Sequence, residues 1–343
     1  MKSINDLELP SDWLCIKTID MHTGGEPLRI ILDGFPTPVG NSVIEYRNYF
    51  RTRQDHLRRA LMYEPRGHAD MYGVIITPSK VADFGVVFTH NEGYSTMCGH
   101  ATIAITKLAV AARWVEVSEG ETSMKIEAPC GLLTATAEVE NNSVKSMKFE
   151  NVPSFVVGLD FQLEIVGLGL LTFDIAYGGA YYAIVDADTI DLDLSMNNYQ
   201  SIRKLGVVIK KSIIDSSIEI VHPIEEGLSF LYGVIFTTKN VEGVGHSRNV
   251  CVFADGEVDR SPTGSGVSAR AAVNFTRGTQ GVGETHTTES IVGSNFDCRI
   301  IREEDYFGIN AVIPEVSGTA YITGKHQFVI DPDDPYKEGF FLC

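Results

Sequence analysis

The sequence predicts a mixed α/β (α+β) fold of two similar domains, each a β-barrel-like sheet around one central helix. Short strand-like runs separated by Gly, Pro and Asn make up most of the chain. Two strongly apolar helical segments, far apart in the sequence, are each followed by a Gly-punctuated β meander. A chain of 343 residues, with 44% hydrophobic and 21% charged residues, is long enough for two domains with ordinary globular cores.

The first ninety residues contain strands around one amphipathic helix. We expect strands at residues 15–20, 28–32, 72–77 and 84–89, because each run is apolar and bounded by turn-forming residues. A helix is predicted over residues 43–62, where apolar and aromatic side chains recur at helical spacing. In an acidic protein we expect the basic face of this helix to pair with the protein's own carboxylates rather than with nucleic acid. That face carries Arg47, Arg51, Arg53, Arg58 and Arg59.

The composition excludes several classes of partner. The chain has 28 Lys and Arg residues against 45 Asp and Glu residues, and the resulting net charge of −17 repels phosphate backbones and anionic membranes. We therefore expect no nucleic acid partner and no membrane partner. Residues 1–13 contain no apolar stretch of signal-peptide length. The six cysteines lack CxxC spacing, which predicts reduced thiols in a cytoplasmic protein.

Two buried helices are predicted at related places in the two halves of the chain. The first lies in MCGHATIAITKLAVAARW and begins at Cys98, and the second lies in DRSPTGSGVSARAAVNF and begins at Thr263. The halves therefore resemble a diverged repeat. We expect residues 1–175, joined by the C-terminal residues 326–343, to carry Cys98, and residues 176–325 to carry Thr263.

The two helix starts together predict a carboxylate site. A helix N-terminus offers unpaired N–H groups and a partial positive charge. Equivalent positions of paired domains tend to face one cleft, so both helix starts are expected to bind the same small carboxylate despite the negative net charge. The amides that would bind it belong to Gly99, His100, Gly264 and Ser265.

Cys98 is the candidate base or nucleophile, because a thiol at a helix N-terminus has its pKa lowered toward neutrality. The other five cysteines lie in strand-like runs or in the tail and are expected to be structural. The hydroxyl of Thr263 is not ionised near neutral pH and needs a separate base to act. Asp259 is either a turn residue or the acceptor for a protonated amine. His100 tunes the thiol, binds substrate or caps the helix.

The sequence indicates neither a metal nor an organic cofactor. The SPTGSG segment lacks the GxxxxGK[ST] spacing of a phosphate loop. The histidines show no HExxH pattern and no evident ligand set. The expected partner is therefore a small amino-acid substrate alone.

The chain resembles the proline racemase family at MCGHATIA paired with DRSPTGSG, and at IDMHTGGEPLRI and EPRGHADMYG upstream. The resemblance extends from about residue 19 to residue 328. It implies a cofactor-independent enzyme with a diaminopimelate epimerase-like fold, in which two pseudo-symmetric domains enclose the substrate. Racemases and epimerases of that family use two cysteines, one on each face of the substrate α-carbon. Here Cys98 keeps the first position and Thr263 replaces the second, which resembles the trans-3-hydroxy-L-proline dehydratase branch.

That resemblance implies a reaction and a role for each site residue. The expected reaction is dehydration of trans-3-hydroxy-L-proline to Δ1-pyrroline-2-carboxylate, with Cys98 removing the α-proton. The four amides would hold the carboxylate and Asp259 would hold the ring nitrogen. Thr263 is the second catalytic position, where it either avoids returning a proton to the wrong face or orders the site through a hydrogen bond. Two alternatives stay open: a proline or hydroxyproline racemase or 2-epimerase, and a catalytically silent protein that binds proline-like amino acids. The sequence leaves the oligomeric state open, with a homodimer as one candidate.

Overall fold

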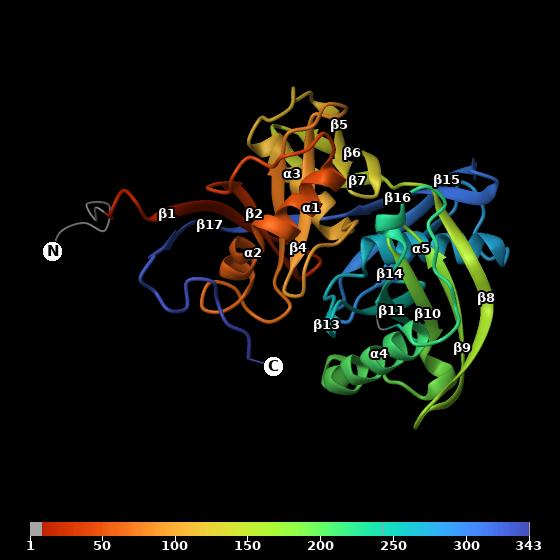
Figure 1. Cartoon of the computed structure of the whole chain (residues 1–343). Coiled ribbons are helices and arrows are strands. Elements are labelled where there is room, and N and C mark those ends of the chain that lie inside the picture. The colour runs from red at the N-terminus through yellow and green to blue at the C-terminus, as the bar shows by residue number, and fades with distance from the viewer. Residues whose placement is uncertain (1–8, 242, 343) are drawn as a thin grey trace.

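The computed structural model describes residues 9–241 and 243–342. Within them, seventeen strands form one hydrogen-bonded sheet that encloses two helices, α3 (Gly99–Ala111) and α5 (Gly264–Thr276). Figure 1 shows a red-to-yellow lobe around α3 and a green-to-blue lobe around α5, with strand β17 (Ala320–Ile330) returning beside β1 (Leu14–Thr23). The predicted fold of two similar α/β units is confirmed.

The remaining elements fall into the same two lobes. The first lobe also contains β2 (Glu26–Asp33), α1 (Val43–Arg53), α2 (Asp55–Met62), β3 (Tyr72–Thr77), β4 (Phe84–His90), β5 (Gly120–Ala128), β6 (Gly131–Glu140) and β7 (Ser143–Glu150). The second contains β8 (Ser154–Ile165), β9 (Gly169–Tyr177), β10 (Tyr181–Asp186), α4 (Tyr199–Ile214), β11 (Leu231–Thr238), β12 (Ser247–Phe253), β13 (Glu257–Val258), β14 (Thr285–Glu289), β15 (Asn295–Tyr306) and β16 (Ile309–Gly318). Short 3-10 helices are η2 (Ala187–Ile190), η3 (Met196–Asn198) and η4 (Glu226–Leu228).

Both central helices are enclosed by strands in one repeated order. From β1 to β7 the pairings β2–β3 and β4–β5 are parallel and the others are antiparallel. From β9 to β16 the pairings β10–β11 and β12–β14 are parallel in the same places. Strand β16 also pairs with β8, so the strands around α5 form a closed ring. This repetition confirms the two pseudo-symmetric units that the sequence predicted.

The strand pairings bear on where one unit ends and the next begins. The β8–β9 hairpin pairs with β10 and packs against α5, although all but its last two residues fall within the predicted first segment 1–175. Strand β16 pairs with both β7 and β8 and so belongs to the wall that the two lobes share. We therefore propose that the chain passes from the first unit to the second at residues 151–153 and returns to the first at β17.

The central helices are buried almost all round because their residues are apolar or small. Helix α3 buries all its residues except Lys107 and the terminal Ala111, and the buried set includes its two inner threonines. Thr102 and Thr106 donate their hydroxyl hydrogen bonds to the backbone carbonyls four residues earlier, at 2.8 and 2.7 Å. The burial therefore leaves no threonine hydroxyl unpaired in this helix. No helix in the described part of the chain is long and apolar enough to cross a membrane.

The helix expected over residues 43–62 is in fact two helices. Gln54 leaves helical geometry, with φ of −131° and ψ of 17°, and separates α1 from α2. Asp55 then opens α2 and forms ion pairs with Arg58 at 2.6 Å and Arg59 at 3.2 Å. Arg59 also pairs with Glu338 from the C-terminal segment. The expected pairing of the basic face with the protein's own acids is thus confirmed for α2.

The cysteines of the described residues are unbridged. They are Cys15, Cys98, Cys130, Cys251 and Cys298. Cys343, expected to be structural, lies outside the described residues.

Candidate active site

The N-termini of α3 and α5 touch each other. Gly99 opens α3 after Cys98, and Gly264 opens α5 after Thr263. An added Cβ on Gly264 would lie only 2.6 Å from the Cα of Gly99, and a Cβ on Gly99 would overlap the backbone of Gly264. Glycine is required at both positions because two backbones occupy the space that a side chain would fill. The contact brings both helix starts to one point, as the sequence predicted.

One buried cavity gathers all seven predicted site residues. They are Cys98, Gly99, His100, Asp259, Thr263, Gly264 and Ser265. Its other walls are mainly aromatic, from Tyr72, Met97, Tyr182, Tyr232 and Phe253. The cavity volume is about 20 Å³, close to that of a single water molecule by this measure. A ring-sized substrate therefore enters only when side chains or lobes move apart.

Cys98 is the N-cap of α3 and points its sulfur into the cavity. The backbone N–H of Ala101 donates to Sγ at 3.4 Å, and Nδ1 of His100 lies 3.2 Å from Sγ. Burial raises the pKa of the Cys98 thiol well above its usual range, and the carboxylate of Asp259 raises it further, while the Ala101 N–H opposes the shift. The expectation of a lowered thiol pKa is therefore wrong in this structure, because desolvation outweighs the helix N-terminus.

His100 is a neutral partner of the thiol. Burial lowers the pKa of its imidazole to about 3. Its ring meets the ring of Tyr72 edge to face, with 4.8 Å between centroids. Thr23 donates its hydroxyl hydrogen bond to the His100 carbonyl at 2.9 Å, so the HTGG segment braces the start of α3. Of the three roles left open for His100, contact with the thiol is the one that this geometry shows.

Thr263 and Asp259 form the opposite side of the cavity. Thr263 has a φ of 67°, unusual for a β-branched residue, and its buried Oγ1 has no hydrogen-bond partner among the described residues. Asp259 is 4% exposed, and its Oδ1 accepts a hydrogen bond from the Ser261 N–H at 2.7 Å. Burial raises the pKa of the Asp259 carboxyl, against the hydrogen bonds that favour its ionised form. A cation beside Asp259 would offset the free-energy cost of burying its ionised carboxylate.

Most of the aromatic wall was not assigned from the sequence. The hydroxyls of Tyr182 and Ser265 lie 2.7 Å apart, which ties β10 to the first turn of α5. The hydroxyls of Tyr72 and Tyr232 lie 3.4 Å apart across the cavity. The sequence offered two local signals: Tyr72 lies in the EPRGHADMYG segment, and Tyr182 lies in a GGAYY run, where aromatics at the mouth of a strand could wall a pocket.

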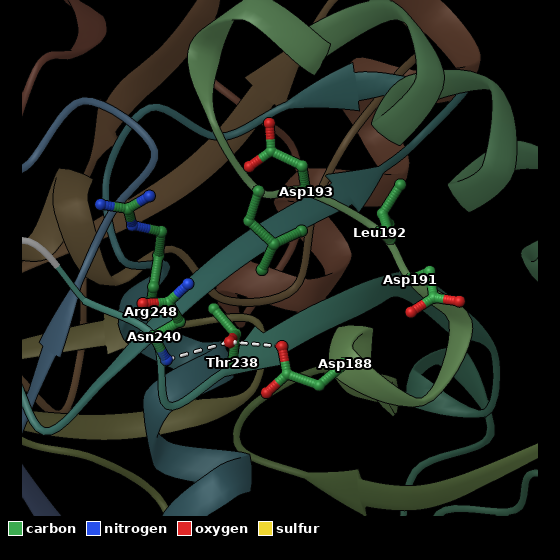
Figure 2. Close-up of a pocket in the computed structure, with 8 residues that line it drawn as sticks. Asp188, Asp191, Leu192, Asp193, Thr238, Asn240 and Arg248 are labelled. Atoms are coloured by element: carbon green, nitrogen blue, oxygen red, sulfur yellow. Dashed lines mark hydrogen bonds between the residues drawn. The ribbon is translucent and has the colours of Figure 1, made fainter.

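A larger surface pocket lies elsewhere, with a volume of about 380 Å³. Figure 2 shows its Thr238 hydroxyl between the Asn240 N–H and the Asp188 carboxylate, with hydrogen bonds of 3.0 and 2.7 Å. Arg248, on the same pocket, is paired with Glu289. Its central polar groups are already satisfied and it contains no cysteine or histidine, so the narrow cavity at Cys98 is the candidate active site.

The sequence pattern of the proline racemase family matches residues 18–341. The chain belongs to the proline racemase family. Among its relatives, the trans-3-hydroxy-L-proline dehydratase of Colwellia psychrerythraea is 51% identical over 332 residues, which cover 96% of this chain and 93% of the relative. The trans-L-3-hydroxyproline dehydratase of Xenopus tropicalis is 41% identical over 338 residues, 97% of each chain.

A solved structure of the family shares the fold. The hydroxyproline epimerase from Agrobacterium vitis, crystallised with bound trans-4-hydroxy-L-proline, superposes with a TM-score of 0.91. It is 30% identical, and the match covers 97% of this chain and 96% of the epimerase. The expected family and the expected fold are therefore both confirmed.

Proposed function

We propose that this protein is a hydro-lyase that removes water from trans-3-hydroxy-L-proline and yields Δ1-pyrroline-2-carboxylate. One observation carries the proposal: a single buried cavity holds one thiol, Cys98, and on the equivalent helix start holds Thr263, which is not a second acid or base. Relatives that match nearly the whole chain at 41–51% identity carry the name of this dehydratase, which supports the proposal.

In the proposed complex the substrate is held at its two charged groups. The first-turn amides of Gly99, His100, Gly264 and Ser265 would bind the carboxylate, because helix N-termini concentrate unpaired N–H donors. Asp259 would pair with the protonated ring nitrogen. Burial is the main cause of the raised pKa of the Cys98 thiol, and the Asp259 carboxylate adds to it; pairing with the substrate nitrogen removes this second contribution and so favours the thiolate. The closed cavity then strengthens each of these interactions by excluding water.

Cys98 would act as the base on one face of the ring. In trans-3-hydroxy-L-proline the 3-hydroxyl and the α-hydrogen lie on the same face, opposite the carboxylate. The thiolate takes the α-proton, the C–H electrons form the C2–C3 double bond, and the C3–O bond breaks. The proton on Cys98, or one relayed through His100 at 3.2 Å, joins the departing hydroxide to give water. The enamine product tautomerises to the cyclic imine, and the thiolate is regenerated.

Thr263 would keep the reaction one-sided. A threonine hydroxyl does not deliver a proton readily to a carbanion near neutral pH, so the opposite face of the α-carbon is not reprotonated. Its Oγ1, which has no hydrogen-bond partner in the described part of the chain, would donate a hydrogen bond to bound substrate. A racemase or 2-epimerase, the alternative within the family, would need a second acid at this position.

The proposal is tested by incubating purified protein with trans-3-hydroxy-L-proline and following the products by proton NMR. Wild type should form Δ1-pyrroline-2-carboxylate, and Cys98→Ser should not. A Cys98→Ser variant with full dehydratase activity would show that the proposed base is wrong. Binding of the substrate without loss of water would favour a silent binding protein.

We retain two further proposals on location and assembly. The unbridged cysteines of the described residues agree with a cytoplasmic enzyme. A homodimer stays a prediction, which sedimentation velocity of the purified protein would check.

A further inference from the structure

A second cavity, of about 360 Å³, lies beside the active site and is lined by both lobes. Arg47 and Arg51 reach it from α1, and Lys210 reaches it from α4. The loop after β4 adds Glu92, and the chain before β11 adds Phe230. We call this space the access chamber.

A layer of aromatic side chains lies between the access chamber and the active-site cavity. Tyr232 lines both spaces. It stacks on Phe253 with 5.5 Å between ring centroids, and its hydroxyl lies 3.4 Å from that of Tyr72. His90 packs against the same layer, 6.1 Å from Tyr232 between centroids. A side-chain movement of Tyr232 would therefore join the two spaces.

The access chamber holds cations that lack carboxylate partners. Among the described residues, Arg47, Arg51 and Lys210 have no acidic side chain within ion-pair distance, unlike Arg58 and Arg59 of α2. Arg47 donates to the Tyr94 carbonyl at 2.9 Å, and its buried Nε has no partner among the described residues. Burial lowers the pKa of both Arg47 and Lys210, so each cation would gain from a bound anion.

This arrangement runs against the charge of the whole protein. A net charge of −17 repels carboxylates from most of the surface. Three cations that form no ion pair among the described residues line this one cavity beside the aromatic layer, although Glu92, Asp255 and Glu257 lie near enough to Lys210 to act against the burial that lowers its pKa. Glu92 is the one acid on the same cavity, and it complements a cationic ring nitrogen.

We propose that the access chamber is a binding site for the zwitterionic substrate before it enters the active site. Arg47, Arg51 and Lys210 bind the carboxylate, Glu92 faces the ring nitrogen, and Tyr232 forms the movable wall. The assignment of a cyclic amino acid rests on the proposed dehydratase function, whereas the selection of small carboxylates rests on the charges of the chamber alone.

Charge-removing variants test the chamber by steady-state kinetics with trans-3-hydroxy-L-proline. Each of Arg51→Gln and Lys210→Gln should lower kcat/KM about threefold at low ionic strength, and the double variant roughly tenfold, because each cation acts through solvent at close range. The loss should fall on kcat/KM rather than kcat, and it should shrink in high salt. Arg53→Gln and Lys211→Gln, exposed neighbours on the same two helices, are the matched controls.

Alkylation of Cys98 gives a second readout that needs no turnover. Iodoacetate carries a carboxylate and iodoacetamide does not. Both alkylate the sulfur through their CH2 carbon and release iodide, so the carboxylate is the difference that the comparison tests. The ratio of their rates at the Cys98 peptide, measured by mass spectrometry, should fall about tenfold in the double variant and stay unchanged in the controls. An unchanged ratio in the double variant would overturn the access chamber. A lowered ratio in a protein that dehydrates nothing would overturn the proposed function and leave the chamber standing.

Discussion

Substitution of Gly264 by alanine tests whether contact between the two helix starts builds the active site. The added Cβ would lie 2.6 Å from the Cα of Gly99, and ordinary carbon contacts need about 3.5 Å, so the helix starts must separate by about 1 Å. Overpacking of this kind costs about 1–3 kcal/mol of folding free energy. A displacement of about 1 Å at reacting groups lowers the rate by roughly 100-fold. We therefore expect a folded but nearly inactive protein.

The assay for this prediction pairs kcat and KM for trans-3-hydroxy-L-proline with chemical denaturation. Gly281→Ala is the matched control, because a Cβ there meets only the Glu284 carboxylate at an ordinary 3.6 Å. The control should keep full activity and lose no stability. If Gly264→Ala kept kcat within twofold of wild type with unchanged stability, the helix starts would not be in contact as described and the carboxylate site would be wrong.

Three further substitutions probe the thiol, its partner and the opposite face. Cys98→Ala should lower kcat by roughly 10²–10⁴-fold, the usual contribution of a general base, with little change in KM; a loss below tenfold would contradict its role. Thr263→Cys should gain conversion of L-proline to D-proline, seen by chiral chromatography, and a variant that gains none would show that threonine is not what prevents racemisation. Burial lowers the pKa of His100 from 6.5 to about 3, so below pH 6.5 the unfolded chain takes up a proton that the folded protein does not accept until about pH 3. Stability is therefore lost as pH falls, by about 2 kcal/mol between pH 6.5 and pH 5. When both proteins are denatured at pH 6.5 and at pH 5, the free energy of unfolding should fall by this extra amount in wild type but not in His100→Gln. Equal losses in the two proteins would refute the role of His100.

The sequence predicted the elements whose causes are local. Cys98 and Thr263 stand directly before glycines that open apolar helices, and the structure makes them the N-caps of α3 and α5. The strands of the first lobe follow the apolar runs that predicted them. The break at Gln54 was missed because helical spacing of apolar residues continues across it.

Features that depend on contacts between residues far apart in the sequence could not be predicted from local patterns. Tyr72 comes from β3 of the first lobe, whereas Tyr182 and Tyr232 come from the paired strands β10 and β11 of the second, so the wall forms only where the two lobes meet. The pKa of Cys98 is raised because this wall buries the thiol, and the spacing of residues in the sequence does not predict that burial. The proposed boundary at residues 151–153 depends on the pairing of the β8–β9 hairpin with β10 and β16, which lie later in the chain, so local patterns gave no signal for it.

The central claim is that Cys98 works alone, on one face of the substrate. The most direct test is proton NMR in D₂O with trans-3-hydroxy-L-proline in one sample and L-proline in a parallel sample. We expect Δ1-pyrroline-2-carboxylate from the first and no D-proline from the second. Formation of D-proline, or deuterium at the α-carbon of hydroxyproline without loss of water, would contradict one-sided dehydration by Cys98.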